Sequence, residues 1–187
     1  MIFFDIEEIN NISEELLNHE LAHLSAQEYK KISVLRSDGK RCSLAVRALL
    51  RKAIEKNFGI KNYVVHCDEN GKPTLEFCYL SLSHSGRYVA CAVSDKPVGI
   101  DIEEIKEIKK RERYHYFSAA EADYINSSDK ALSERFLTVW TRKEARYKCE
   151  NVNIGRIADI SVIGENNSYN FITEVNKKYI FSVCNKK

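Results

Sequence analysis

One short stretch of this sequence, Val-Gly-Ile-Asp-Ile-Glu, constrains the local fold more than any other. Successive side chains of an extended chain point to opposite faces, so Val98, Ile100 and Ile102 lie on one face. Asp101 and Glu103 then lie together on the other face. The pattern predicts a strand that buries its apolar face and directs two carboxylates toward a common point.

Two carboxylates held so close together repel each other, and a fold that keeps them usually places a cation, a proton or a basic group between them. A hard divalent ion such as magnesium, which takes one or two protein carboxylates, is the natural candidate. The segment Trp-Thr-Arg-Lys-Glu-Ala-Arg-Tyr-Lys adds Glu144 as a third acid, and Lys148 follows one helical turn later on the same side. Three acids and a lysine suggest a metal-assisted site for a phosphate-bearing substrate.

An ordinary protein surface explains the same residues. Asp101 and Glu103 also fit the solvated face of an edge strand, and Glu144 with Lys148 fits a surface ion pair that stabilises the protein very little. Spacing alone does not separate this interpretation from the metal site.

Composition excludes several classes of protein. The chain has 187 residues, of which 44% are hydrophobic and 30% are charged, as in soluble globular proteins. No apolar stretch approaches the roughly twenty residues that cross a bilayer, and the first residues lack the basic flank of a signal peptide. We therefore expect a cytoplasmic protein with no membrane partner. The formal net charge of +2 is too small to indicate binding to nucleic acid.

The cysteines indicate an intracellular protein with reduced thiols. There are six, at positions 42, 67, 78, 91, 149 and 184, with no Cys-x-x-Cys pair and no zinc-ribbon spacing. Cys91 alternates with apolar neighbours in Tyr-Val-Ala-Cys-Ala-Val, which is typical of a small core residue. We expect most of these thiols to be buried.

The first half of the chain alternates helix and strand patterns. Ser25 and Glu28 have the spacing of a capping box, and Asp38 and Gly59 can begin and end a longer helix. Leu82 to Gly86 is interpreted as a run of turn-forming residues between strands. The other expected elements are a strand at 1–6, a helix at 13–24, a tight turn at Asn70-Gly71, and strands at 63–67 and 88–93.

The second half repeats this arrangement. Ser118 and Glu121 have the spacing of a second capping box, residues 133–149 predict a long helix, and strands are expected at 157–163, 169–175 and 179–184. The expected fold class is α+β, with two pseudo-symmetric lobes that each pack a small antiparallel sheet with helices. We place the lobes at residues 1–96 and 97–187, with the acid-bearing strand at the junction.

A second metal-binding pattern, His-Glu-Leu-Ala-His, lies on the first predicted helix. Two imidazoles four residues apart, here His19 and His23, can share a zinc ion while the glutamate acts as general base. The extended metzincin pattern needs a glycine and a third histidine where this chain has Ala26 and Tyr29. The segment also fits an ordinary amphipathic helix, and we favour that interpretation over a zinc peptidase.

Five separated motifs share one order with a known family. They are Gly71-Lys-Pro, Leu82-Ser-His-Ser-Gly, Pro97-Val-Gly-Ile-Asp-Ile-Glu, Phe117-Ser-Ala-Ala-Glu, and Trp140-Thr-Arg-Lys-Glu-Ala with Lys148 after it. Together they resemble the 4′-phosphopantetheinyl transferases of the surfactin-synthetase-activating type. The resemblance implies a monomer of two α/β lobes with coenzyme A bound in the cleft between them.

The resemblance also implies an activity. Such enzymes transfer the 4′-phosphopantetheine arm of coenzyme A to a serine of an apo carrier protein, acyl or peptidyl, and release adenosine 3′,5′-bisphosphate. Asp101, Glu103 and Glu144 would hold magnesium. The base would be Glu144 or a water held by Glu103, and Lys148 would stabilise or protonate the leaving oxygen. The sequence does not choose between the two bases.

Further residues would contact the nucleotide by the same resemblance. The expected phosphate contacts are Lys72, Ser83 and His84, with Lys31, Ser43 and Arg41 around the 3′-phosphate.

Two positions depart from the family pattern. Glu28 stands where relatives often carry a basic residue, and Cys149-Glu-Asn-Val-Asn153 replaces the glycines that often follow the final lysine. With Glu28 in place of a basic residue, the phosphate pocket can be built differently from that of relatives. Without the glycines after Lys148, a contact to the pantetheine arm or the carrier can differ as well. The alternative function is a catalytically inactive module of the same fold that binds carrier proteins.

Overall fold

The computed structural model describes residues 1–69, 71–108, 114–128, 131–150, 157–164 and 168–187. These residues form two compact units, Met1–Lys96 and Pro97–Lys187. Each unit contains a three-stranded antiparallel sheet and one long helix that packs on it. The expected α+β class, with small antiparallel sheets packed with helices, is confirmed.

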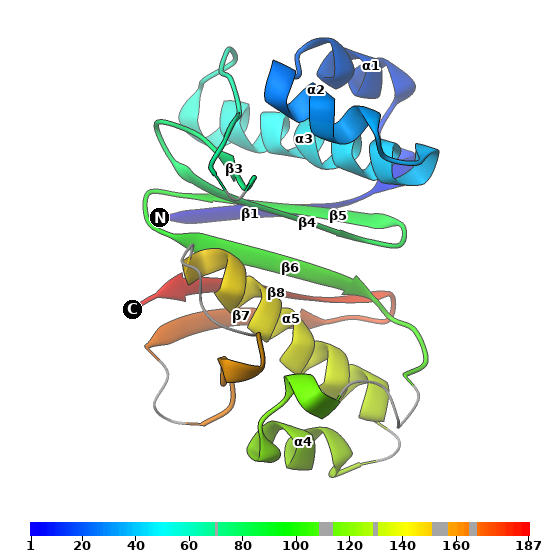
Figure 1. The fold of residues 1–187 in the computed structure, drawn as a ribbon, viewed down its shortest axis with the longest axis vertical. Helices are drawn as coiled ribbons and strands as arrows, with labels where there is room; N and C mark the ends of the chain where they lie inside the picture. The colour runs from blue at the N-terminus through cyan, green and yellow to red at the C-terminus, as the bar shows by residue number, and fades with distance from the viewer. Residues whose placement is uncertain (70, 109–113, 129–130, 151–156, 165–167) are drawn as a thin grey trace. The chain divides into compact units, whose positions relative to one another are not determined.

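The sheet of the first unit has the strand order β1-β5-β4, with β1 at Ile2–Glu8, β4 at Tyr79–Ser85 and β5 at Tyr88–Ser94. The long helix α3 (Ser37–Phe58) packs on this sheet, and α1 (Glu14–Ala22) and α2 (Ala26–Ser33) pack against α3. Figure 1 shows the three helices together on one side of the sheet. The core between them contains Leu50 and Ile54 from α3 and Val89, Cys91 and Val93 from β5.

The ends of these helices follow local chemistry. Ser25 and Glu28 form the expected capping box at the start of α2. Gly59 ends α3 in a left-handed conformation, with φ of 70°, that favours glycine. The expected cap at Asp38 is wrong, because α3 begins at Ser37 and Arg36 is its N-cap. Asp38 instead lies in the first turn, where a negative charge is favourable near the positive end of the helix dipole.

Two expectations about strands in the first unit need correction. Only His66–Cys67 (β2) of the segment 63–67 pairs, with Pro73–Thr74 (β3). The run Leu82 to Ser85 is the end of β4 and not a turn, since Ser85 pairs with Tyr88 across a connection of Gly86 and Arg87. Leu80 and Leu82 alternate toward the core, and this burial favours a strand over the turn preference of the serines.

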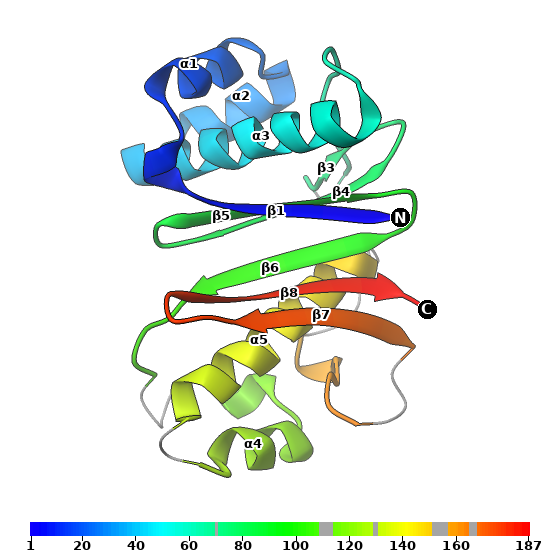
Figure 2. The ribbon, with the colours of Figure 1, turned by 180° about the vertical axis from the view of Figure 1, so that it is seen from behind.

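The sheet of the second unit has the order β6-β8-β7, with β6 at Val98–Glu104, β7 at Tyr169–Val175 and β8 at Tyr179–Lys186. The helix α5 (Leu132–Glu150) packs across one face of this sheet, and α4 (Ala119–Asn126) packs against α5. Figure 2 shows the three strands from the side opposite to α5. Ile125, Leu137, Val139 and Ile180 are fully or almost fully buried between these elements.

The strand expected at 157–163 is wrong. Ile157–Asp159 forms a 3-10 helix, and Ile160 and Val162 are buried without joining a sheet. The amide of Val162 donates to the carboxylate of Glu121 on α4, at 2.9 Å, instead of to a neighbouring strand. The capping box of Ser118 and Glu121 is present as expected.

Two further expectations concern membranes and thiols. None of the described helices is both long and apolar enough to cross a membrane. All six cysteines are free thiols, and Cys78, Cys91, Cys149 and Cys184 are buried. Burial raises the pKa of Cys91 to about 12, as expected for an unreactive core thiol.

Candidate active site

A glycine sets the distance between β6 and α5 in the second unit. A Cβ atom on Gly99 would lie 1.9 Å from the carbonyl oxygen of Ala145 and 2.6 Å from the amide nitrogen of Cys149. Residue 99 therefore faces α5, and no side chain fits between the two backbones. Because side chains alternate along a strand, Asp101 and Glu103 face α5 as well.

Lys148 on α5 lies against the first of these acids. Its Nζ donates to Asp101 Oδ1 at 2.7 Å and to the carbonyl oxygen of Ile100 at 3.2 Å. Asp101 is only 5% exposed. A buried carboxylate is stable only with a charged or hydrogen-bonding partner, and Lys148 supplies one. The interpretation of Asp101 as part of a solvated surface is therefore wrong.

Glu144 lies one helical turn before Lys148 and belongs to the same charge cluster. Burial raises the pKa of Glu144, the negative charge of Asp101 raises it further, and Glu103 adds a smaller effect in the same direction. Lys148 acts in the opposite direction and lowers this pKa. Asp101, Glu103, Glu144 and Lys148 thus form one electrostatically coupled group, hereafter the acid–lysine cluster.

The acid–lysine cluster has the donor chemistry of a site for a hard cation. Its three carboxylates offer the oxygen ligands that magnesium prefers, and a divalent ion would relieve the repulsion that raises the pKa of Glu144. Lys148 occupies one oxygen of Asp101 in the described conformation. Within the described residues, no three His, Cys, Asp or Glu side chains are arranged to hold a metal. The residue types fit magnesium, but in the described conformation Asp101 is paired with Lys148.

A second, buried ion pair on α5 was not indicated by the sequence. Lys143 Nζ donates to Glu121 Oε2 at 2.7 Å, and both side chains are 0% exposed. Lys143 also donates to the carbonyl oxygen of Ile160, and Glu121 accepts from the amides of Ser118 and Val162. The pair joins α5 to α4 and to the segment around Ile160. Glu121 was the one residue of this pair that the sequence pattern singled out. Its place in the capping box was a sufficient explanation, so no buried partner was expected.

Two of the expected phosphate contacts meet in the first unit. Lys31 on α2 donates from Nζ to the carbonyl oxygen of Gly71, at 2.9 Å, directly before Lys72. The amide of Lys72 donates to Asp68 Oδ1 at 2.8 Å, which orders this connection between β2 and β3. Gly71 has φ of 82°, and a Cβ there would lie 2.3 Å from Lys31 Nζ. The structure thus brings Lys31 and Lys72, forty-one positions apart in the sequence, to one loop.

The other expected contacts lie on separate surfaces or have other partners. Ser83 is buried on β4, and the next residue, His84, is exposed, as expected for neighbours on opposite faces of a strand. Arg41 on α3 forms an ion pair with Glu14 on α1. The carbonyl oxygen of Ser43 accepts a hydrogen bond from Arg47.

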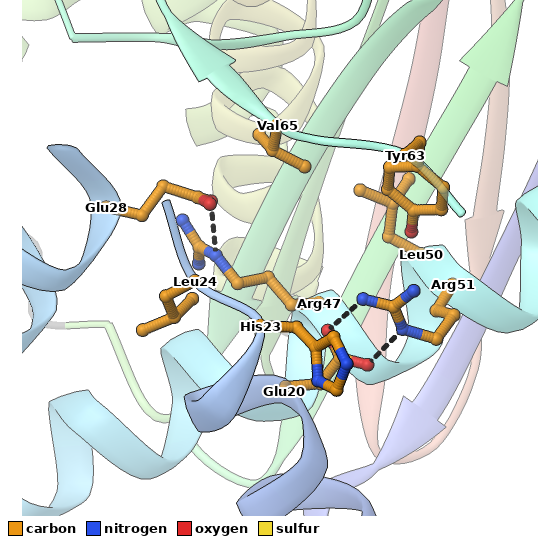
Figure 3. Close-up of a pocket in the computed structure, with 9 residues that line it drawn as sticks. All are labelled: Glu20, His23, Leu24, Glu28, Arg47, Leu50, Arg51, Tyr63 and Val65. Carbon is orange, nitrogen blue, oxygen red and sulfur yellow. Dashed lines mark hydrogen bonds and ion pairs between the residues drawn. The ribbon is translucent and has the colours of Figure 1, made fainter. Parts of the chain in front are cut away.

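The His-Glu-x-x-His segment is part of a structural network on α1. The rings of His19 and His23 stack with their centroids 4.1 Å apart, and His23 Nδ1 contacts the carbonyl oxygen of His19. Glu20 is buried and pairs with Arg51 on α3. Figure 3 shows this pair beside a second one, Glu28 with Arg47, in a small pocket between α1, α2 and α3. Stacked rings do not converge on a metal, and the glutamate is already paired, so the helix interpretation is favoured.

Parts of two of the motifs discussed above lie outside the described residues. Residues 151–153, at the departure after Lys148, and Asn70 of the tight turn are among them. Gly71, the other residue of that turn, donates from its amide to the carbonyl oxygen of Asp68 at 2.9 Å.

Comparison with known proteins gives one consistent family. Residues 97–184 match the model of the 4′-phosphopantetheinyl transferase superfamily. The chain is 34% identical to the 4′-phosphopantetheinyl transferase gsp of Aneurinibacillus migulanus over 73% of this chain and 59% of gsp. It is 35% identical to the 4′-phosphopantetheinyl transferase psf-1 of Bacillus pumilus over 58% of this chain and 49% of psf-1. For the 4′-phosphopantetheinyl transferase Sfp of Bacillus subtilis the identity is 32%, over 54% of this chain and 48% of Sfp. The chain spans about half the length of the curated relatives it matches.

Proposed function

Because this chain belongs to the 4′-phosphopantetheinyl transferase superfamily, we propose that it transfers 4′-phosphopantetheine from coenzyme A to a serine of an apo carrier protein. The second product is adenosine 3′,5′-bisphosphate. The proposal includes magnesium as cofactor, an acyl or peptidyl carrier as partner, and a cytoplasmic monomer as the working form.

The observation that carries this proposal is the acid–lysine cluster. Asp101 and Glu103 on β6 face Glu144 and Lys148 on α5, and Gly99 lets the two backbones meet closely. Phosphoryl transfer from a pyrophosphate needs negative oxygens to be neutralised, an attacking hydroxyl to be deprotonated and a leaving oxygen to be stabilised. The cluster holds one residue type for each of these needs.

The metal would be held by Asp101, Glu103 and Glu144 together with pyrophosphate oxygens of coenzyme A. A magnesium ion held by these residues would neutralise charge on the pyrophosphate and so would make its phosphorus more electrophilic.

Proton transfer would be the task of the protein side chains. In the reaction the carrier serine oxygen bonds to the phosphorus that bears pantetheine, and the bond from that phosphorus to the bisphosphate oxygen breaks. The serine proton passes to Glu144, or to a water held by Glu103. Without a bound metal, burial and the charge of Asp101 raise the pKa of Glu144, which favours a carboxylate that can accept a proton. The ammonium of Lys148 stabilises or protonates the leaving oxygen.

Residues of the first unit would bind the nucleotide phosphates. Lys31 donates to the carbonyl oxygen of Gly71, the residue before Lys72, so the two lysines would offer their ammonium groups to the same anion. We assign Ser83 and His84 to the other phosphate oxygens. We keep Arg41 and Ser43 as contacts to the 3′-phosphate, which requires Arg41 to leave Glu14.

A panel of apo carrier proteins tests the proposal. Each carrier is incubated with the protein, coenzyme A and magnesium, and released adenosine 3′,5′-bisphosphate is measured by chromatography. The proposal predicts release that depends on both carrier and magnesium and is lost in Asp101→Ala. If every class of carrier gives no release although coenzyme A binds, the inactive carrier-binding module is the better account.

A further inference from the structure

A short helix carries Lys31, and few contacts hold it in place. Helix α2 has eight residues, and only Glu28 and Ile32 among them are buried. A helix of this length is not stable alone in water, so its position depends on tertiary contacts. The contact made by Glu28, one of the two buried residues of α2, therefore helps to fix where Lys31 lies.

Glu28 is held on three sides. Its Oε1 accepts a hydrogen bond from Arg47 Nε on α3 at 2.8 Å, and its side chain is 3% exposed. Its Oε2 accepts from the amide and the hydroxyl of Ser25 in the capping box. Arg47 is itself fixed, since its NH1 donates to the carbonyl oxygen of Ser43 at 2.8 Å. Figure 3 shows Glu28 reaching across to Arg47.

Lys31 lies three residues after Glu28, on the adjoining part of the same helix. While Glu28 points inward to Arg47, Lys31 reaches outward to the loop before Lys72. A rotation or shift of α2 would therefore move the Lys31 ammonium away from Gly71.

We infer that Glu28, paired with Arg47, is a positioning residue that holds Lys31 beside Lys72 for an anionic phosphate group. The inference rests on the proposed function for the identity of the ligand, coenzyme A. An acid at position 28 then supports a phosphate site although its own charge repels phosphate, because the charge is buried and paired with Arg47.

Two accounts of Glu28 predict opposite effects of one substitution. Glu28→Gln keeps the size of the side chain and a hydrogen-bonding group for the capping box, and removes one negative charge. If Glu28 acted only through long-range charge, this variant would bind the coenzyme A anion more tightly. If it positions Lys31, both Glu28→Gln and Glu28→Ala bind coenzyme A more weakly, the second by roughly tenfold or more.

A double-mutant cycle separates positioning from general destabilisation. The dissociation constant of coenzyme A is measured by calorimetry, and KM and kcat by transfer to a carrier, for Glu28→Ala, Lys31→Ala and the double variant. We expect weaker binding and a higher KM in both single variants, with kcat nearly unchanged, and no further loss when Glu28→Ala is added to Lys31→Ala. Glu55→Ala, which removes an exposed partner of Lys61, is the matched control and should change neither value.

An additive loss in the double variant, or tighter binding by Glu28→Gln, would overturn the inference.

A second measurement does not depend on coenzyme A. The lysines are 13C-methylated, and the Lys31 resonance, assigned with Lys31→Arg, is followed by NMR. We expect it to shift in Glu28→Gln and Glu28→Ala and to stay in place in Glu55→Ala. A wild-type protein that binds no coenzyme A would defeat the proposed function, whereas an unmoved Lys31 resonance would defeat the positioning itself.

Discussion

Gly99 on β6 lies so close to Ala145 on α5 that a Cβ atom at residue 99 would come within 1.9 Å of the Ala145 carbonyl oxygen. Ala145 directly follows Glu144. The close approach of the two backbones therefore determines how far Glu144, the proposed base, lies from Asp101 and Glu103 on β6. The glycine is needed here for close approach of two backbones and not for an unusual φ angle.

Gly99→Ala should therefore push α5 away from β6. We expect a loss of about 1–3 kcal/mol in the free energy of unfolding, typical of overpacking, and a fall of about 100-fold in kcat from misplaced groups. Urea unfolding and transfer kinetics measure the two effects. Gly39→Ala on α3 is the control, because its new Cβ would meet Leu35 at an ordinary 3.6 Å. Equal activity in Gly99→Ala and Gly39→Ala would contradict the positioning of α5 by Gly99.

Lys148→Met should remove the cation that accompanies Asp101. The variant loses the 2.7 Å contact to Asp101, and the transition state loses a charge near the leaving oxygen. We expect kcat to fall about 10²–10³-fold, with Lys148→Arg retaining part of the activity. Steady-state kinetics at saturating coenzyme A provide the measurement. Full activity in Lys148→Met would exclude this lysine from the reaction.

Magnesium binding should strengthen as pH rises through the raised pKa of Glu144. Burial and the charge of Asp101 raise the pKa of Glu144 above the ordinary value, so Glu144 keeps its proton to a higher pH than an exposed glutamate does. A metal ligand must lose this proton, so protons and magnesium compete for the carboxylate. Calorimetry with magnesium across the range from about pH 5 to about pH 8 should show weaker binding at the acid end. Glu144→Gln should remove most of this pH dependence, and an affinity independent of pH in the wild type would refute the competition.

Removal of one partner from the buried pair of Glu121 and Lys143 should strongly destabilise the second unit. Lys143→Met leaves the carboxylate of Glu121 buried beside Val162 without its cation, which should cost about 3–5 kcal/mol in the free energy of unfolding. The double variant Glu121→Leu with Lys143→Met should lose less than the sum of the single variants. Chemical denaturation measures both. The exposed pair of Glu55 and Lys61 is the control, and Glu55→Ala should lose less than about 1 kcal/mol.

The two halves of the acid–lysine cluster were predictable because each depends only on the periodicity of its own strand or helix. Alternation along a strand places Asp101 with Glu103, and helical spacing places Glu144 with Lys148. That the two pairs face each other depends on Gly99, whose role is visible only once α5 packs on β6. Helix caps at Ser25, Gly59 and Ser118 were predictable for the same local reasons.

The rest of the structure depends on partners that are distant in the sequence. Residues 157–163 have the composition of a strand, but the amide of Val162 binds Glu121, forty-one residues away, and no sheet forms there. Leu82 to Ser85 contain turn-forming residues, but the buried Leu80 and the partly buried Leu82 pack against the core and extend β4 through them. Glu28 gives no sign in the sequence that Arg47 would neutralise it.

The intact mass of an apo carrier protein is the most direct test of the proposed reaction. The carrier is incubated with coenzyme A, magnesium and either the wild-type protein or Glu144→Gln, and each mixture is analysed by mass spectrometry. We predict a gain of one phosphopantetheine group on the carrier serine with the wild type and little or none with Glu144→Gln. An unchanged carrier mass with the wild type, for acyl and peptidyl carriers alike, would contradict the central claim.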